Sequence, residues 1–300
     1  MVIAYFDCFS GISGDMILGA LIHAGVDFDQ LTTELQKLPL DGYRLERRLV
    51  KKHEITGVKV DVIIETAVGT EHIEGPGDGG LDQAKLHGHT HEHGHTHEHG
   101  HTHEHGHEHG HTHEHGHSHE HGHTHEKTFD ACHIHALISL IEGSHLDTTV
   151  KRQACAIFDQ LAEAEGMIHG VPKTDVHLHE VSGKDAIIDI VGACIGLSLL
   201  GVEEVYASAL PLGSGFVRCA HGRMPVPAPG ALELLRGLPV YQTTTKGELV
   251  TPTGAAFLKT LSVGYGPMPP MLLRQVGYGA GTKDFAEHPN LLRVSIGDKM

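Results

Sequence analysis

The stretch VHLHEVSGKDAIIDIVG, residues Val176–Gly192, joins an expected strand to an expected helix. Apolar and polar residues alternate from Val176 to Val181, which predicts a short strand because strand side chains repeat with a period of two. Ser182 begins a turn and is an acceptable N-cap for a helix predicted over Lys184–Leu200. The stretch therefore predicts a strand–turn–helix unit.

Polar residues that can bind a divalent metal are concentrated at this junction. His177 and His179 share one face of the expected strand, and Glu180 follows them. Asp185 and Asp189 are four residues apart, so both carboxylates lie on one face of the helix. Two imidazoles and up to three carboxylates make a divalent-metal site. The alternative is a set of solvated polar groups, since the helix dipole favours acids at an N-terminus.

Composition favours a cation-binding protein of the cytoplasm. The chain has 300 residues, 31 histidines and a formal net charge of −16 with histidine neutral. This acidity disfavours non-specific binding to nucleic acid. The five cysteines form no CxxC pair, which is typical of a reducing compartment. We expect no signal peptide and no membrane span of about 20 apolar residues.

A low-complexity tract occupies the middle of the chain. Every odd position from His87 to His125 is histidine, with Gly, Thr, Ser and Glu between. A tract without apolar residues is expected to be disordered in the absence of metal. Imidazole suits Zn, Cu and Ni, so we predict a metal reservoir; the alternative is a pH-sensitive solvated linker. The predicted ligands are His87, His89, His91, His93, His95, His97, His99 and the remaining tract histidines to His125.

Two turns resemble anion-binding sites. The first follows an apolar strand at Val2–Phe6 and precedes a helix at Met16–Ala24, which leaves backbone N–H groups facing outward. The second precedes a helix that ends at Leu261, with Thr251 as N-cap and Pro252 at the first helical position. A plain βα turn and a well-capped helix are the alternatives. The candidate phosphate-binding residues are Ser10, Gly11, Ser13, Gly14, Asp15, Thr251, Thr253 and Gly254.

A third polar segment precedes a proline-rich stretch. His221 is a candidate metal ligand, and Arg223 can clamp a carboxylate or a phosphate. We expect paired strands at Tyr43–Lys51 and Ile55–Glu65. Further predicted elements are a helix at Ala131–Ile141, a longer helix capped by Asp147 and ended by Gly166, a short helix at Ala231–Arg236, and strands at Val205–Leu212, Pro239–Gln242 and Leu291–Ile296.

The expected fold is α/β, with a mixed sheet or sheets flanked by helices. Residues 1–68 would begin the α/β domain, residues 69–127 would form the disordered His-rich linker, and residues 128–300 would form the main α/β domain.

Several segments together resemble one family. They are FDCFSGISGDM (Phe6–Met16), the stretch Val176–Gly192, PLGSGFVRCAHGRMPVPAPG (Pro211–Gly230), TPTGAA (Thr251–Ala256) and GYGAGTKD (Gly277–Asp284). These motifs, long and in order, are similar to those of the LarC-type nickel insertion proteins.

The resemblance implies an activity and its partners. Members insert nickel into pyridinium-3,5-bisthiocarboxylic acid mononucleotide, a lyase-class cyclometallation that forms a Ni–C bond beside Ni–S bonds. The product is the nickel-pincer nucleotide cofactor of lactate racemase, and the family step uses CTP with Mg or Mn. Two departures stand out: Ser182 and Gly183 replace an expected Gly-Ala pair, and the family's C-terminal nucleotide-binding domain is absent. The chain would then be the N-terminal component of a split enzyme.

Under this hypothesis the His tract gathers nickel and passes it to the ligands at the strand–helix junction. The substrate would lie near Ser10–Asp15, Arg223 and Thr251–Gly254. A general base must take the ring C–H proton, and we predict Glu180 or His179. One alternative is a nickel storage protein or metallochaperone without catalysis. Another is a metal-dependent phosphohydrolase.

Overall fold

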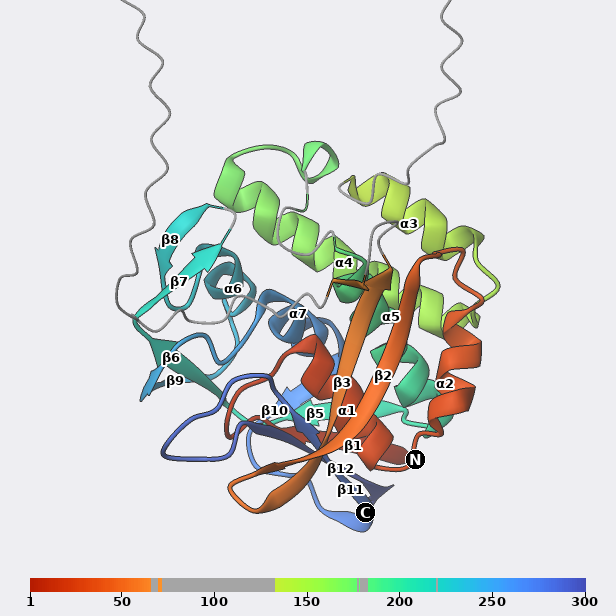
Figure 1. The fold of residues 1–300 in the computed structure, drawn as a ribbon, viewed down its shortest axis with the longest axis vertical. Coiled ribbons are helices and arrows are strands. Elements are labelled where there is room, and N and C mark those ends of the chain that lie inside the picture. The colour runs from red at the N-terminus through yellow and green to blue at the C-terminus, as the bar shows by residue number, and fades with distance from the viewer. Residues whose placement is uncertain (66–69, 72–132, 177, 179–182, 220) are drawn as a thin grey trace, which may run out of the picture. The chain divides into compact units, whose positions relative to one another are not determined.

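Twelve strands and eight helices, one of them a 3-10 helix, make up the described part of the chain (Figure 1). This computed structural model describes residues 1–65, 70–71, 133–176, 178, 183–219 and 221–300. The strands are β1 (Val2–Asp7), β2 (Tyr43–Lys52), β3 (Ile55–Glu65), β4 (Thr70–Glu71), β5 (Glu204–Ala207), β6 (Leu210–Ser214), β7 (Phe216–Cys219), β8 (Gly222–Pro225), β9 (Val240–Lys246), β10 (Ser262–Tyr265), β11 (Met271–Ala280) and β12 (Leu291–Lys299). The helices are α1 (Gly14–His23), α2 (Phe28–Leu35), α3 (Ile134–Gly143), α4 (Thr148–His169), the 3-10 helix η1 (Lys173–Asp175), α5 (Lys184–Leu199), α6 (Pro229–Leu234) and α7 (Pro252–Leu261).

One large mixed sheet contains eight of these strands. Seven follow one another in the order β10-β5-β1-β12-β11-β3-β2, and β4 pairs with β3. β1 is parallel to β5 and antiparallel to β12, so the two ends of the described chain meet in the middle of the sheet. The remaining strands form two small sheets, β6 with β9 and β7 with β8. The predicted α/β class with a mixed sheet is confirmed.

Helices cover this sheet in layers. α1 packs on β11 and β3, and α7 packs on β5 and β10. α5 packs on α1, and α4 packs on both α5 and α7. The close approach of α1 to the sheet needs a residue without a side chain, because a Cβ at Gly279 would overlap the Met16 carbonyl oxygen. The Gly-rich sequence of β11 therefore serves helix packing.

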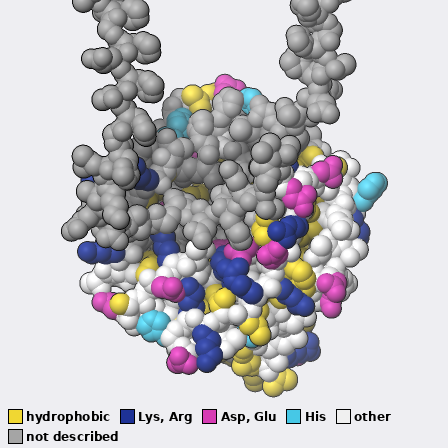
Figure 2. Space-filling view, viewed as in Figure 1, with side chains coloured by type: hydrophobic (Ala, Val, Ile, Leu, Met, Phe, Trp, Pro, Cys, Tyr) yellow, Lys and Arg dark blue, Asp and Glu magenta, His cyan; other side chains and the backbone are white. Residues whose placement is uncertain are grey.

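The edge of the sheet at β2 is protected by charge. β2 pairs only with β3 in the sheet order, and its side chains include Arg44 and Arg48. Arg44 forms an ion pair with Glu46, and Arg48 forms one with Asp61 of β3. Figure 2 shows basic and acidic side chains interleaved on the face that carries these strands. Charged edges of this kind discourage pairing with another chain.

Several local predictions are confirmed. β2 and β3 pair antiparallel, as the sequence of the hairpin indicated. The Asp147 side chain caps α4 by accepting a hydrogen bond from the Thr149 N–H at 2.7 Å. Thr251 caps α7 in the same way, with Pro252 as the first helical residue. These features depend on residues only a few positions apart, which is why the sequence alone predicts them.

The expected strand at Val176–Val181 is not supported by its described residues. Val176 is the C-cap of η1, and Leu178 has no regular secondary structure. Both side chains are fully buried, so their apolar spacing reflects burial rather than a strand. Residues 177 and 179–182 lie outside the described residues. The N-cap of α5 is Gly183 and not Ser182, and a side chain at 183 would overlap the Asp185 carboxylate.

Two further predictions are corrected. The strand expected at Val205–Leu212 is divided, because β5 joins the large sheet while β6 leaves it to pair with β9. α4 runs past Gly166 to His169 and ends at Gly170, whose φ of +66° is the left-handed conformation of a helix C-cap. The longer α4 carries His169 on its last turn, where it matters for the site below.

The chain divides into two units. All described residues belong to the unit formed by Met1–Asp78 and Phe129–Met300. The second unit, Gly79–Thr128, contains the His tract and lies outside the described residues. None of the described helices combines the length and the apolar character that a membrane crossing requires.

Candidate functional site

The two predicted anion-binding turns lie side by side. Ile12 and Val250 form a parallel bridge between them. The Ile12 N–H donates to the Leu249 carbonyl at 2.8 Å, and the Thr251 N–H donates to the Ile12 carbonyl at 3.1 Å. The N-terminal ends of α1 and α7 are thereby held together, although they are more than 200 residues apart in sequence. Their partial positive charges add at one place.

Hydroxyl groups at this junction are engaged in specific hydrogen bonds. The Thr251 hydroxyl accepts from the Gly254 N–H at 3.3 Å, while the Ser13 hydroxyl donates to the Asp15 carboxylate. The Ser10 hydroxyl lies 3.2 Å from Nδ1 of His288, a residue that sequence reasoning did not select. Nε2 of the same imidazole lies 3.1 Å from the Thr245 hydroxyl. His288 therefore links the first turn to the segment that precedes the second.

The aspartates of the sequence prediction form part of an acidic group at the first turn of α1. We define the acidic group as Asp15, Asp61, Asp185 and Asp189 with Lys59. The Lys59 ammonium lies 2.6 Å from Asp15 Oδ2 and 3.3 Å from Asp61 Oδ1. Gly14 allows α1 to approach α5 here, because a Cβ at position 14 would overlap the Asp189 carboxylate.

Burial and charge shift the pKa values in the acidic group. Asp189 Oδ1 is shielded from solvent and has no hydrogen-bond partner among the described residues. Burial, followed by repulsion from Asp15 and Asp185, raises the pKa of Asp189 well above its ordinary value. Burial opposes the charge of Lys59, but its ion pairs outweigh that effect and raise its pKa. Lys59 thus acts as the resident cation of the acidic group.

His221 belongs to a second cluster of candidate ligands, which we call the imidazole group. It consists of Glu165 and His169 near the end of α4, with His221 in the turn between β7 and β8. The two Nε2 atoms are 3.1 Å apart, and His169 Nε2 lies 3.3 Å from Glu165 Oε2. All three ligand atoms lie within 4.8 Å of one another. Such a set can hold a metal ion.

Sequence reasoning missed Glu165 and His169. The signal that could have found them is their spacing of four residues, which puts both on one helix face. That signal was lost because α4 was expected to end at Gly166. Cys219, which precedes His221 in the sequence, is half-buried.

Some of the other predicted site residues are among those described and some are not. Asp185 lies in the first turn of α5, next to Lys184, whose ammonium donates to the Asp41 carbonyl at 2.6 Å. Arg223 on β8 stacks over the Phe216 ring at 4.3 Å from its centroid. His177, His179, Glu180 and the tract from His87 to His125 lie outside the described residues, so their roles stay predictions.

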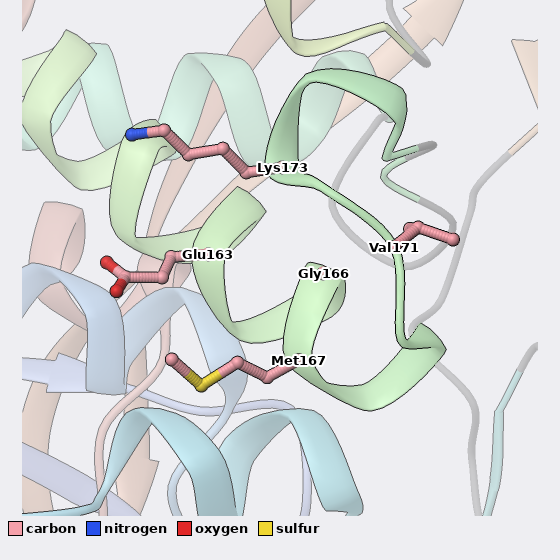
Figure 3. Close-up of a pocket in the computed structure, with 5 residues that line it drawn as sticks. All are labelled: Glu163, Gly166, Met167, Val171 and Lys173. Atoms are coloured by element: carbon pink, nitrogen blue, oxygen red, sulfur yellow. The ribbon is translucent and has the colours of Figure 1, made fainter.

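A hollow of about 340 Å³ opens at the C-terminal end of α4. Figure 3 shows Glu163 and Met167 extending from α4 in the same direction as Lys173, while Val171 points the other way. Gly166 completes the lining. The volume of the hollow is at the lower end of the range for small-molecule sites. Because Gly166 and Met167 line it, the hollow adjoins the last turn of α4, which carries His169.

The chain is similar to known proteins over almost its whole length. Residues 4–300 match the model of a family described as nickel insertion protein, which confirms the resemblance that the motifs predicted. A protein of Dictyoglomus thermophilum named putative nickel insertion protein is 41% identical over 294 residues, which are 98% of this chain and 60% of the relative. No solved structure matches the chain.

Two relatives carry a more specific name, pyridinium-3,5-bisthiocarboxylic acid mononucleotide nickel insertion protein. The one from Geobacillus kaustophilus is 40% identical over 299 residues, which cover 100% of this chain and 60% of that protein. The one from Desulfitobacterium hafniense is 39% identical over 298 residues, which cover 99% of this chain and 59% of that protein. The chain therefore spans about 60% of the length of the relatives it matches.

Proposed function

We propose, since this chain belongs to the nickel insertion protein family, that it takes part in inserting nickel into pyridinium-3,5-bisthiocarboxylic acid mononucleotide. The observation that carries the proposal is the family match over residues 4–300, together with the substrate in the names of two relatives. Nickel is the cargo of the reaction, and the product would serve a lactate racemase-type apoenzyme. Because the chain covers about 60% of those relatives, the complete activity would require the remaining part.

The joined N-termini of α1 and α7 suit the phosphate of a mononucleotide. Backbone N–H groups and the positive ends of two helix dipoles favour an anion at Ser10–Asp15 and Thr251–Gly254. The bridge between Ile12 and Val250 supports this proposal, because it gives both turns a common position. Arg223, on β8, remains a candidate for a thiocarboxylate or phosphate of the substrate.

The metal side of the proposal uses the predicted ligands. Nickel gathered by the His tract would pass to His177, His179 and Glu180, with Asp185 and Asp189 nearby in sequence. During cyclometallation the ring C–H bond breaks as the Ni–C bond forms, and the proton goes to a base. Glu180 or His179 is our candidate for that base.

CTP with Mg or Mn is the remaining cofactor implied by the family resemblance. Hard cations prefer carboxylate ligands. Lys59 is ion-paired with both Asp15 and Asp61, which leaves Asp185 and Asp189 of the acidic group for such a cation. A lysine ammonium paired with two of the four carboxylates does not suit a Mg site, and we assign no step to CTP on these residues.

Reconstitution tests the proposed function. The chain is mixed with the thiolated mononucleotide, nickel, CTP and Mg or Mn, with and without the C-terminal domain of a relative. Cofactor formation is read from activation of an apo racemase. Activity that requires the added domain would support a split insertase. No activity in either mixture, from chain that binds nickel, would contradict an insertase role.

A storage role is the second candidate, and the His tract is the observation that favours it. Deleting Gly88–Glu126 separates the two functions. An insertase without the tract should still work at high free nickel, because the tract only gathers the metal. A storage protein should lose most of its nickel capacity and show no insertion under any condition.

A further inference from the structure

Two histidines and a glutamate meet where α4 ends beside the β7–β8 hairpin (Figure 1). We propose that Glu165, His169 and His221, the imidazole group, form a binding site for a divalent first-row transition metal. The identification of that metal as nickel rests on the proposed function, whereas the site itself rests on geometry. Of these three residues, only His221 is among the metal ligands predicted from the sequence.

The distances in the imidazole group match those between ligands of one ion. Ligand atoms about 2.1 Å from a metal lie about 3.0 Å apart at right angles and about 3.4 Å apart in a tetrahedron. The observed separations are 3.1 Å between the two Nε2 atoms and 3.3 Å between His169 Nε2 and Glu165 Oε2. The third pair, Glu165 and His221, is within 4.8 Å, so one ion can reach all three atoms after a small rotation of these side chains.

The ligand chemistry selects the class of metal. Two imidazole nitrogens with one carboxylate oxygen suit Zn, Cu and Ni better than Mg or Ca, which prefer oxygen. The two Nε2 atoms lie 3.1 Å apart, so both ring nitrogens can face one ion. Glu165 contributes a carboxylate ligand, and this residue is only 4% exposed.

The surrounding structure holds the ligands in place. Glu165 and His169 are four residues apart on α4, so the helix fixes their relative position. His169 lies on the last turn, where the carbonyl ends of the helix favour a cation. A Cβ at Gly230 of α6 would lie 3.3 Å from Glu165 Oε1, so α6 packs closely on this carboxylate. His169 retains 30% exposure of its side chain, which leaves an approach for the ion.

The competing explanation is a hydrogen-bonded chain from Glu165 through His169 to His221 that binds no metal. Such a chain would be insensitive to nickel. Hydrogen–deuterium exchange of the full chain separates the two, because it reports on each segment and so distinguishes this site from the His tract. Nickel chloride is the probe, a chelator buffer sets its free concentration, and no nucleotide is present.

We expect nickel to slow exchange at residues 164–171 and 216–225 with one common midpoint. His169→Ala and His221→Ala should raise that midpoint at least about tenfold, since loss of even an outer-shell partner costs 10- to 100-fold in affinity. Glu165→Gln should act in the same direction. Glu163→Gln, two residues away on α4, and His145→Ala, an exposed histidine after α3, are matched controls that should leave the midpoint unchanged.

Absence of nickel protection at both segments would overturn the proposal, and so would protection that survives both histidine substitutions. Should a variant fail to fold, crystals of the wild-type chain with nickel give the answer. An anomalous peak at the nickel edge within about 2.3 Å of the three ligand atoms supports the site. A peak only elsewhere overturns it. The exchange experiment contains no nucleotide and therefore tests this site independently of insertion. Nickel binding here without insertion in the reconstitution would count against the proposed function alone. Insertion without nickel binding here would count against this site alone.

Discussion

The acidic group and the imidazole group offer opposite environments to a metal ion. The acidic group contains its own cation, because the Lys59 ammonium lies between Asp15 and Asp61. The imidazole group brings two ring nitrogens and one carboxylate close together at the end of α4. The carboxylates of the acidic group are therefore not equally available to a metal ion, because Lys59 pairs with two of them. The acidic group is built to join α1, α5 and β3, and the imidazole group is built to bind a cation.

The strongest test of this comparison removes the resident cation. Lys59→Met should lower the free energy of unfolding by about 3 kcal/mol, because Asp15 and Asp61 lose their buried partner. The measurement is urea unfolding. Arg48→Met is the matched control: Arg48 pairs with the same Asp61, but its side chain is 53% exposed, so the loss should stay below about 1 kcal/mol. Equal losses for the two variants would show that Lys59 does not hold the acidic group together.

Packing between α1 and α5 should be nearly as sensitive. Gly14→Ala places a Cβ against the Asp189 carboxylate, and overpacking of this kind costs about 2 kcal/mol. Gly143→Ala in α3 is the control, because a Cβ there meets no atom within 4 Å. We expect that control to be neutral or slightly stabilising. Thermal unfolding of both variants measures the difference, and an unaffected Gly14→Ala would contradict the described approach of the two helices.

The raised pKa of Asp189 predicts that the stability of the folded protein depends on pH through this residue of the acidic group. Its folded state binds a proton more tightly than the unfolded state, so its contribution to stability is complete below about pH 4 and is lost as pH rises through the folded pKa. Asp189→Asn removes this titration. In that window the stability of the wild type should fall relative to the variant, by at most about 1.4 kcal/mol per pH unit. A pH-independent difference between the two would be inconsistent with the raised pKa.

The smallest expected effect separates the two helix caps. Thr251→Ala and Asp147→Ala should each cost about 1 kcal/mol of stability, since each removes an N-cap. Only Thr251→Ala should also weaken binding of the mononucleotide, because α7, unlike α4, begins beside the first turn. Calorimetric titration of both variants with the nucleotide checks this. Equal binding would remove Thr251 from the substrate site.

The sequence predicted features that depend on neighbouring residues. The caps at Asp147 and Thr251 and the hairpin of β2 with β3 are such features. Lys59 was not recognised, because a lysine between valines in an alternating strand has the pattern of a solvent-facing residue. In the structure its side chain is only 7% exposed. The alternation of apolar and polar residues in β3 cannot show that α1 and α5 cover the face of the strand that carries Lys59.

The imidazole group was inaccessible to sequence reasoning for a different reason. His169 and His221 are 52 residues apart, and only the packing of α4 beside the β7–β8 hairpin brings them together. The stretch Val176–Gly192 predicts a metal site because it contains many potential ligands close together in sequence. Five of its residues lie outside those described. Many potential ligands in one stretch of sequence predict that a binding site exists, whereas tertiary contacts decide which residues share that site.

Nickel binding at the imidazole group should set how much nickel the reaction needs. We would measure the nickel dependence of cofactor formation in the reconstituted system for the wild type and for His221→Ala. We expect the His221→Ala variant to need at least about tenfold more free nickel for half-maximal formation, with activity recovered at saturation. His145→Ala, the exposed histidine after α3, should show the wild-type nickel dependence. An active His221→Ala variant with unchanged nickel dependence would show that the imidazole group does not supply nickel to the reaction.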